Sequence, residues 1–295
     1  MQLQIQGLSK RYPNGTQALQ DVSLSIPQGM FGLLGPNGAG KSTLMRTLAT
    51  LQEADSGAAS LDGIDVLRQK DEVRRLLGYL PQEFGLYPKV TAETLLTHFA
   101  QLKGIENAGE RRDVVHALLR QTNLWDHRGK SLGSYSGGMK QRFGIAQALL
   151  GNPRLIIVDE PTAGLDPEER VRFHNLLSAI GENVVVILST HIVSDVSDLC
   201  SQMAIIHQGR VHAAGEPMAL VTQLNGRIWR KAIDRSQVAD YQQRFRVISM
   251  HLFGGRNVLH VLHDELPESG FEPIAPDLED LYFATIKGFT AGAVN

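Results

Sequence analysis

The stretch GPNGAGKST, residues 35–43, decides the fold of this chain. It fits the pattern G-x-x-x-x-G-K-[ST], follows an apolar run at residues 30–34 and precedes a helical pattern at residues 42–51. In that setting the glycines let successive backbone N–H groups point inward around a phosphate, and the N-terminus of the helix adds positive potential. Lys41 can then reach the β and γ phosphates of a nucleotide, and Ser42 can ligate Mg²⁺. We therefore predict a phosphate-binding loop between a buried strand and a helix.

Other apolar runs share the texture of the run before this loop. They are continuous rather than alternating, which is typical of strands covered on both faces, and they span residues 155–158, 184–188 and 203–206. A helical pattern at residues 167–180 follows the first of them, with Asp166 as N-cap, a proline next and Glu169 in the capping-box position. Because strand and helix alternate, we predict an α/β fold with a mostly parallel sheet.

Two stretches of the sequence have patterns that differ from this alternation of strand and helix. Residues 3–27 alternate between polar and apolar side chains, which predicts an N-terminal antiparallel β subdomain packed on one face of the core. From about residue 91 to residue 150 the chain has helical patterns only. We interpret that stretch as a helical subdomain, at about residues 85–150, inserted between core strands.

The texture changes again after about residue 220. Residues 245–264 resemble a hairpin with glycines at its turn, and a helix capped by Asp277 follows. We therefore expect a nucleotide-binding domain over residues 1–220 and a small α+β appendage over residues 221–295.

The composition is that of an ordinary globular protein. The 295 residues are 42% apolar and 20% charged, and the net charge of -2 argues against a generic nucleic-acid binder. Cys200 is the only cysteine, so we expect a reducing compartment. The stretch MQLQIQGLSKRYP lacks the apolar core of a signal peptide, and the longest apolar runs are strand-sized. These features predict a cytosolic chain.

A pair of carboxylates follows the second apolar run. In LIIVDEP, residues 155–161, Asp159 and Glu160 come directly after four apolar residues. A buried strand would carry them to the carboxyl edge of the sheet, where α/β proteins bind ligands. We predict that Asp159 joins the Mg²⁺ shell and that Glu160 polarises the attacking water. The alternative is a pair of surface charges.

A second possible phosphate site occurs at YSGGMKQR, residues 135–142. A serine and two glycines open what must continue as a helix, although Ser136 could be an ordinary N-cap residue. A small GTPase would need an N-K-x-D type motif, which is absent, and a kinase would have no use for this serine and double glycine.

These motifs together resemble those of the ATP-binding subunit of an ABC transporter. Across residues 1 to about 220 the chain matches the short motifs of that family in order. The set comprises the phosphate loop, Gln82 in YLPQEFGLYP, the signature YSGGMKQ, LIIVDE, AGLD ending at Asp166, and His191 in LSTH. Single motifs such as SGG are weak, but the ordered set of six is very specific.

The resemblance implies a function for the second phosphate site. In this family two subunits pack head to tail around two ATP molecules, and the signature of one contacts the nucleotide of the other. Ser136, Gly137 and Gly138 would then face a γ-phosphate held by Lys41 of a second copy or of a homologous ATPase subunit. Each site is only half built in one chain, which predicts ATP-dependent dimerisation.

The resemblance also implies residue roles. Nucleotide contacts would come from Tyr12, Asn37, Gly38, Ala39, Gly40, Lys41, Ser42, Thr43, Ser136, Gly137, Gly138 and Asp166. The catalytic group would be Lys41, Gln82, Glu160 and His191, and the Mg²⁺ group Ser42, Gln82 and Asp159. Tyr12 would stack on adenine, unless it is simply a half-buried strand tyrosine. Tyr135 and Met139 depart from the leucine and glutamine most common in the signature.

The resemblance implies ATP hydrolysis that energises a separate integral membrane permease, and within the family it points to an exporter. The chain would then be peripheral on the inner face of the cell membrane, without a nucleic-acid partner.

An apolar cluster follows Gln82 and would either dock the permease or pack under the helical subdomain; it consists of Phe84, Leu86, Tyr87 and Pro88. A soluble mechanochemical ATPase of the same superfamily is the alternative, and Glu160 and His191 disfavour a scaffold without turnover. The appendage could extend the dimer contact, regulate turnover or cover an apolar face.

Overall fold

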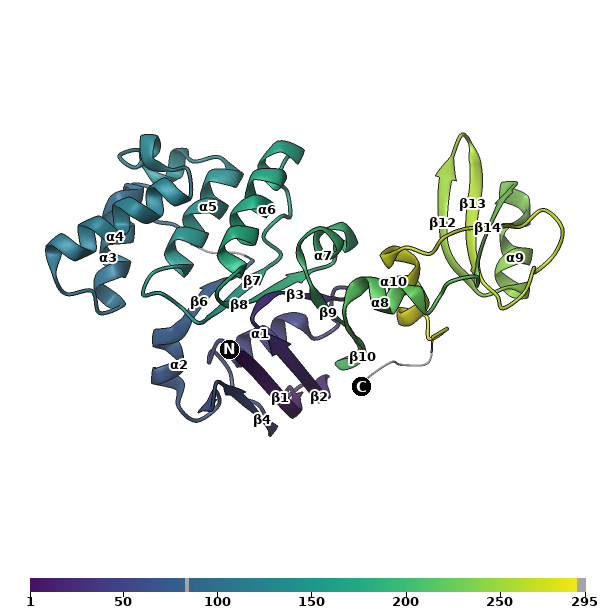
Figure 1. The fold of residues 1–295 in the computed structure, drawn as a ribbon, viewed down its shortest axis with the longest axis horizontal. Helices are drawn as coiled ribbons and strands as arrows, with labels where there is room; N and C mark the ends of the chain where they lie inside the picture. Colours follow the sequence, from purple (N-terminus) through teal and green to yellow (C-terminus); the bar gives the residue numbers. More distant parts are fainter. Residues whose placement is uncertain (83–84, 291–295) are drawn as a thin grey trace.

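The computed structural model describes residues 1–82 and 85–290. The molecule is elongated, with a group of helices at one end, a small C-terminal sheet at the other and the main sheet between them (Figure 1). This arrangement places the sequence motifs around the central sheet.

The central sheet has six strands in the order β10-β9-β3-β8-β7-β6. Every neighbouring pair is parallel except β9 and β10, which are antiparallel. The strands are β3 (Gly29–Leu34), β6 (Leu77–Leu80), β7 (Leu155–Asp159), β8 (Val185–Thr190), β9 (Gln202–His207) and β10 (Arg210–Gly215). The predicted mostly parallel α/β core is confirmed, and β6 and β10 are strands that the sequence patterns did not separate from their surroundings.

Both faces of the central sheet are covered, which explains the continuous apolar runs. In β3, Phe31 and Leu33 lie in an apolar cluster with the N-terminal sheet and α1 (Lys41–Leu48). The alternate residues Met30 and Leu34 lie in a second cluster on the opposite face. That second cluster contains residues of α5 (Gly137–Ala148), α6 (Pro167–Gly181), α7 (Val193–Leu199) and α8 (Pro217–Thr222).

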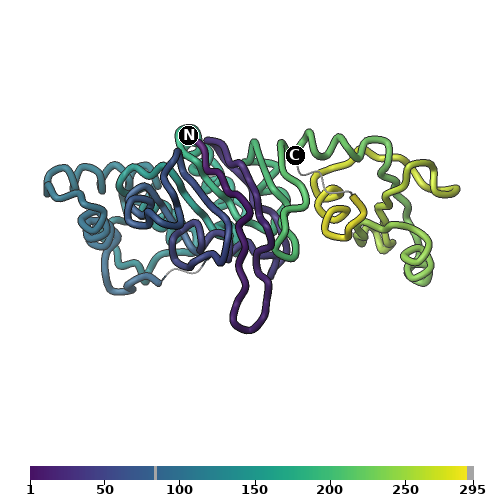
Figure 2. Tube along the Cα trace, turned by 90° about the horizontal axis from the view of Figure 1, so that it is seen from below, coloured from purple at the N-terminus to yellow at the C-terminus, as the bar shows by residue number. Residues whose placement is uncertain are grey.

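The N-terminal sheet is antiparallel, with strand order β2-β1-β4-β5, as the alternating pattern predicted. Its strands are β1 (Gln2–Arg11), β2 (Gln17–Pro27), β4 (Ser56–Leu61) and β5 (Ile64–Asp65). The turn that joins β1 and β2 projects from the body of the molecule as a purple hairpin in Figure 2. This hairpin carries Tyr12.

The helical subdomain is inserted between β6 and β7, as predicted. Its elements are α3 (Ala92–Leu102), α4 (Ala108–Gln121), the 3-10 helices η1 (Trp125–His127) and η2 (Leu132–Ser134), and α5. They enclose their own apolar cluster around the fully buried Phe143. The short helix α2 (Lys70–Leu76) lies before β6 on the core side of the insertion.

The C-terminal region forms a sheet of order β12-β13-β11-β14 and then returns to the core. Its elements are β11 (Ile228–Ile233), η3 (Arg235–Gln237), α9 (Val238–Arg244), β12 (Val247–Phe253), β13 (Arg256–Leu262), β14 (Glu272–Pro273) and α10 (Leu278–Ile286). The predicted hairpin is confirmed as β12 and β13, and Gly254 and Gly255 at its turn both have positive φ.

The terminal helix α10 begins at the predicted cap. The side chain of Asp277 accepts from the backbone N–H of Asp280 at 2.8 Å, within a capping box. Leu278, Leu281 and Tyr282 then join the same apolar cluster as α6 and α7. The appendage therefore contributes side chains to the core, and the domain limit at residues 220/221, which falls within α8, stays a prediction.

No helix among residues 1–82 and 85–290 is both long and apolar enough to cross a membrane.

Candidate functional site

The phosphate loop turns tightly between β3 and α1. Gly40 has φ of +108°, and a Cβ atom there would lie 2.5 Å from the carbonyl oxygen of Ala18 in β2. Only glycine fits both the left-handed conformation and this close backbone approach. The loop is also braced from the turn between β9 and β10, because the N–H of Gly209 donates to the carbonyl of Ala39 at 2.9 Å.

Lys41 closes the loop from inside. Its Nζ donates to the carbonyl oxygens of Gly35 at 2.6 Å and Pro36 at 3.1 Å, and only 5% of the residue is exposed. Burial lowers the pKa of Lys41, whereas the nearby charges of Glu160 and Asp159 raise it. The ammonium is thus held at the position from which it can reach a bound phosphate.

Glu160 lies between a cation and an imidazole. One carboxylate oxygen is 3.8 Å from Lys41 Nζ, and the other is 3.0 Å from Nδ1 of His191. The backbone of Glu160 has φ of +47°, an uncommon conformation for a residue other than glycine, and its N–H donates to the carbonyl of Ser189 at 2.9 Å. Strain of this kind clusters at functional sites. The structure therefore brings Lys41, at the start of α1, together with Glu160 and His191, which directly follow β7 and β8.

Asp159 supplies a buried carboxylate next to this group. Burial raises the pKa of Asp159, and the charge of Glu160 raises it further, while the neighbouring hydroxyls of Ser189 and Ser42 and the charge of Lys41 lower it. A carboxylate beside the Ser42 hydroxyl is a pair of hard oxygen donors, which fits Mg²⁺. Mg²⁺ binds through few protein ligands and completes its shell with water and phosphate oxygens, so these residues fit the expected metal.

A cavity of about 590 Å³ opens above the loop. It is lined by Tyr12, Thr16, Gln17, Ala18, Gln20, residues 36–43, Gln82, Glu160 and Gln208. The predicted loop residues Asn37, Gly38, Ala39, Gly40, Lys41, Ser42 and Thr43 thus share one cavity with Tyr12 and Gln82.

One wall of this cavity was missed by the sequence analysis. Gln17, Gln20 and Gln208 line it from β2 and from the turn after β9. Gln17 and Gln20 occupy positions in an alternating strand and Gln208 lies in a turn, and no phosphate motif requires a glutamine at any of them.

Tyr12 is anchored at the edge of the cavity. Its hydroxyl lies 3.2 Å from Thr43 Oγ1 and donates to Gln52 Oε1 at 3.2 Å. These contacts fix an aromatic ring beside the phosphate loop, where a base could stack.

The signature residues do not line that cavity. Ser136 caps α5, and its hydroxyl accepts from the backbone N–H of Met139 at 3.2 Å. Ser136 and Gly137 are exposed, whereas Gly138 is covered by the Glu169 side chain. An exposed helix N-terminus with free N–H groups can accept an anion from outside the chain.

The departures from the common signature have a packing explanation. Tyr135 is 4% exposed, lies in the apolar cluster of the helical subdomain and donates its hydroxyl to the carbonyl of His127 at 2.9 Å. Met139 packs against the same cluster. Both side chains therefore belong to the interior of the helical subdomain.

Asp166 caps α6, as predicted, and accepts from the backbone N–H of Glu169 at 2.8 Å. The Glu169 carboxylate lies 3.4 Å from the guanidinium of Arg142 in α5. The cap is therefore made by Asp166, and the Glu169 side chain links α6 to the signature helix.

The expected docking cluster is only partly described. Phe84 lies outside the described residues, Leu86 packs against the core of the helical subdomain, and Tyr87 is 64% exposed.

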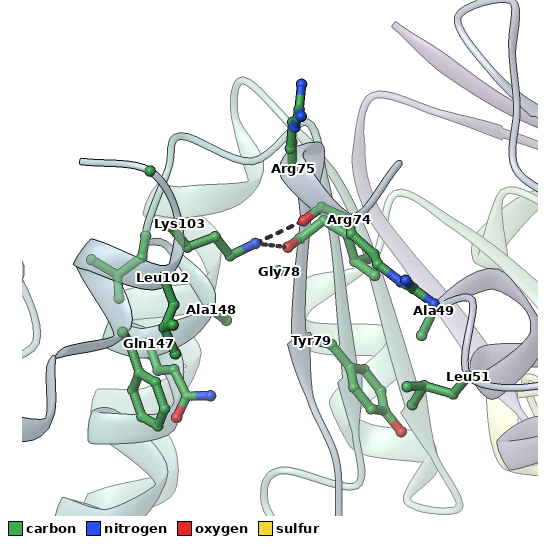
Figure 3. Close-up of a pocket in the computed structure, with 14 residues that line it drawn as sticks. Ala49, Leu51, Arg74, Arg75, Gly78, Tyr79, Leu102, Lys103, Gln147 and Ala148 are labelled. Atoms are coloured by element: carbon green, nitrogen blue, oxygen red, sulfur yellow. Dashed lines mark hydrogen bonds between the residues drawn. The ribbon is translucent and has the colours of Figure 1, made fainter. Parts of the chain in front are cut away.

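A larger groove of about 850 Å³ lies between the helical subdomain and the core (Figure 3). The core side includes Leu51 and Tyr79, and the helical side includes Leu102 and Lys103. Lys103 Nζ donates to the carbonyls of Arg74 at 2.9 Å and Leu77 at 2.7 Å, so it links α3 to the end of α2. The groove is mainly apolar, and it contains no residue of the phosphate loop.

Comparisons with known proteins agree with this geometry. Residues 19–163 match the ABC transporter family. The chain is 31% identical to the uncharacterized ABC transporter ATP-binding protein YxlF of Bacillus subtilis, over 96% of this chain and 99% of YxlF. It is 33% identical to the probable multidrug ABC transporter ATP-binding protein YbhF of Escherichia coli, over 96% of this chain and 52% of YbhF, so it spans about half the length of that relative.

The fold also matches a solved structure, a dimeric post-hydrolysis state of the ATP-binding cassette MJ0796 bound to ADP and Pi. The TM-score is 0.66 at 27% identity, and the match covers 72% of this chain and 98% of that one. The family inferred from the sequence motifs is therefore confirmed. The chain belongs to the family of ABC transporter ATP-binding proteins and is a P-loop ATPase.

Proposed function

We propose that two copies of this chain, or one copy and a homologous subunit, enclose two ATP molecules and energise a separate integral membrane permease that exports its substrate. One observation carries this proposal. The side chains proposed for hydrolysis contact one another inside the chain, whereas the N-terminus of the signature helix α5 is exposed on its surface. The Glu160 carboxylate lies 3.8 Å from Lys41 Nζ and 3.0 Å from His191 Nδ1, while Ser136 and Gly137 are exposed.

Each proposed site residue has its own role in ATP hydrolysis. Lys41 binds the β and γ phosphates. Ser42, Asp159 and Gln82 would hold Mg²⁺, which would supply positive charge against the developing phosphate charge. Glu160 orients and polarises the attacking water. His191, next to Glu160, donates to the γ-phosphate as charge develops there.

The signature acts on the nucleotide of the other copy. The exposed amides at the start of α5 bind the γ-phosphate held by the second subunit, and Asp166 lies at that interface. Nucleotide that the closed pair binds in preference to the separate chains stabilises the pair by up to about 2.7 kcal/mol per site at a hundred times the dissociation constant. The dimeric state of MJ0796 with ADP and Pi supports this arrangement.

The permease docks in the groove of about 850 Å³ shown in Figure 3. Leu51 and Leu102 line it with 62% and 70% exposure, a pair of large apolar side chains that a partner helix would cover. Tyr79, in β6, also lines the groove, and Gln82 follows β6 in the nucleotide cavity. An occupant of the groove would therefore touch the strand that leads to the γ-phosphate side of the site.

The relatives support a direction of transport and a location for the chain. YbhF is named as a multidrug transporter component, which supports a drug-exporting partner. The chain would then lie on the cytoplasmic face of the membrane, held there by the permease. In the alternative, the chain is a soluble mechanochemical ATPase of the same superfamily that works without a membrane partner, and the experiment below separates the two.

The test combines turnover with cross-linking. The purified chain should release phosphate from Mg-ATP. A photoreactive amino acid at Leu102, introduced into the chain in its own cells, should cross-link to an integral membrane protein in washed membranes. The matched control is the same probe at Leu266, which is 55% exposed and remote from the groove residues in sequence. Cross-links only to soluble proteins, or equal membrane cross-linking at both positions, would contradict docking in the groove.

A further inference from the structure

A fully buried carboxylate, Asp195 in α7, lies behind the candidate site. It is 0% exposed. Its Oδ2 accepts hydrogen bonds from Oγ1 of Thr162 at 2.6 Å and from Oγ1 of Thr190 at 3.1 Å. Both threonines are also buried, at 3% and 1% exposure. No sequence motif marks Asp195, because one acidic residue in a short helix forms no pattern.

The other oxygen of Asp195 is bound from α6. Its Oδ1 accepts from Nη2 of Arg170 at 2.6 Å and from Nε of Arg170 at 3.0 Å, and it lies 2.9 Å from Nε2 of His174. Burying a carboxylate is costly unless donors and a counter-charge replace water. Here two hydroxyls, a guanidinium and an imidazole do so, and the carboxylate is fixed from several sides.

The donors come from the segments that carry the proposed catalytic groups. Thr162 lies two residues after Glu160, and Thr190 directly precedes His191. Arg170 lies in the first turns of α6, which Asp166 caps. One carboxylate therefore connects the ends of β7 and β8 at the place where Glu160 and His191 meet at 3.0 Å.

We propose that Asp195 is a positioning residue for ATP hydrolysis. Through Thr162 and Thr190 it holds the carboxylate of Glu160 and the imidazole of His191 in register, without touching the nucleotide cavity itself. This inference rests on the proposed roles of Glu160 and His191.

Removing the hydroxyls tests the proposal. Because Asp195→Asn would leave Arg170 without its carboxylate partner, Thr162→Val and Thr190→Val are the primary variants. Both variants keep the side-chain shape and remove the hydroxyl that binds Asp195. Thr190→Val also removes the acceptor of the Ile192 backbone N–H, whereas Thr162→Val removes the bond to Asp195 alone. We expect kcat to fall roughly 10- to 100-fold, the range for partners that orient metal-binding side chains, with the KM for ATP unchanged. Thr162→Ser and Thr190→Ser keep the hydroxyl and should restore kcat.

The matched control is Thr122→Val. Thr122 is also 0% exposed, and its hydroxyl donates to the carbonyl of Leu118 at 2.8 Å, within the helical subdomain. A general packing effect would lower the unfolding midpoint and turnover alike in all three valine variants. That result, or kcat values within about twofold of wild type for Thr162→Val and Thr190→Val, would overturn the positioning role.

A Glu160→Gln background separates this inference from the proposed function. If Glu160→Gln lowers kcat, adding Thr162→Val should cause no further loss, because the link then positions a group that no longer acts. A full additional loss in that background would overturn the inference. If Glu160→Gln alone leaves kcat unchanged, the proposed role of Glu160 fails, and the positioning role fails with it.

Discussion

The replacement Gly137→Asp is the perturbation that most cleanly separates the proposed role of the signature from the stability of the chain. Gly137 is the first residue of α5, is exposed, and has nothing within 4 Å of the position that a Cβ would take. An aspartate in the first turn of a helix is favourable by about 0.3–1 kcal/mol. The free energy of unfolding should therefore be unchanged or slightly higher.

The same carboxylate would face the γ-phosphate of the second subunit in the proposed closed dimer. Two unit charges about 5 Å apart repel by about 1 kcal/mol in water and by about 3 kcal/mol at the effective dielectric of a protein surface. Each site of the dimer should then be weakened by roughly 10- to 100-fold. Binding of ATP to the single chain should be unaffected, because residue 137 is not among those that line the cavity above the phosphate loop.

The assay is sedimentation of the Glu160→Gln chain with ATP, with and without Gly137→Asp, and with Gly137→Ala as the uncharged control. We expect the dimer with Gly137→Ala and its loss with Gly137→Asp. An equally stable ATP-bound dimer of the Gly137→Asp protein would refute the reasoning, and so would a loss of ATP affinity in the monomer.

Further predictions concern the base, the appendage and one acidic residue. Glu160→Gln should lower phosphate release by about 10² to 10⁴ with nucleotide affinity retained in a fluorescence titration, and comparable turnover would exclude it as the base. Leu281→Ala in α10, 3% exposed within the core cluster, should lower the free energy of unfolding by about 2–5 kcal/mol in one cooperative urea transition. Two separate transitions would show that the appendage is independent of the core. Hydrogen bonds from Lys231 and Tyr241 lower the pKa of Glu268 from 4.5 to about 2. The contribution of Glu268 to the free energy of unfolding is therefore fully present above pH 4.5, and it is lost as the pH falls toward 2. The wild-type melting temperature should drop more steeply over that window than that of Glu268→Gln, and parallel curves would contradict this.

Local patterns predict the parts of this protein that local physics determines. The phosphate loop needs glycine at position 40 because of φ and a close backbone, and the caps at Asp166 and Asp277 are set by residues only three positions away. The buried strands are recognisable because both faces of each are apolar. All of these features could be predicted from the sequence.

Contacts between distant segments could not be predicted in the same way. Asp195 meets Thr162 across 33 positions, and no periodicity encodes that pairing. The short strand β6 reads as LGYL, in which a glycine and a tyrosine hide its apolar character. The return of α10 to the core also depends on which surface is left uncovered once α6 and α7 have packed, which is a property of the assembled fold.

The central claim is that each catalytic site uses residues of two chains, and a mixing experiment tests it directly. A Lys41→Ala chain and a Gly137→Asp chain should each be inactive alone. Mixed in equal amounts with Mg-ATP, they should regain about a quarter of the wild-type sites, since half of randomly formed dimers combine both defects at one site and leave the other intact. No regained phosphate release from a mixture that demonstrably forms mixed dimers would contradict the account.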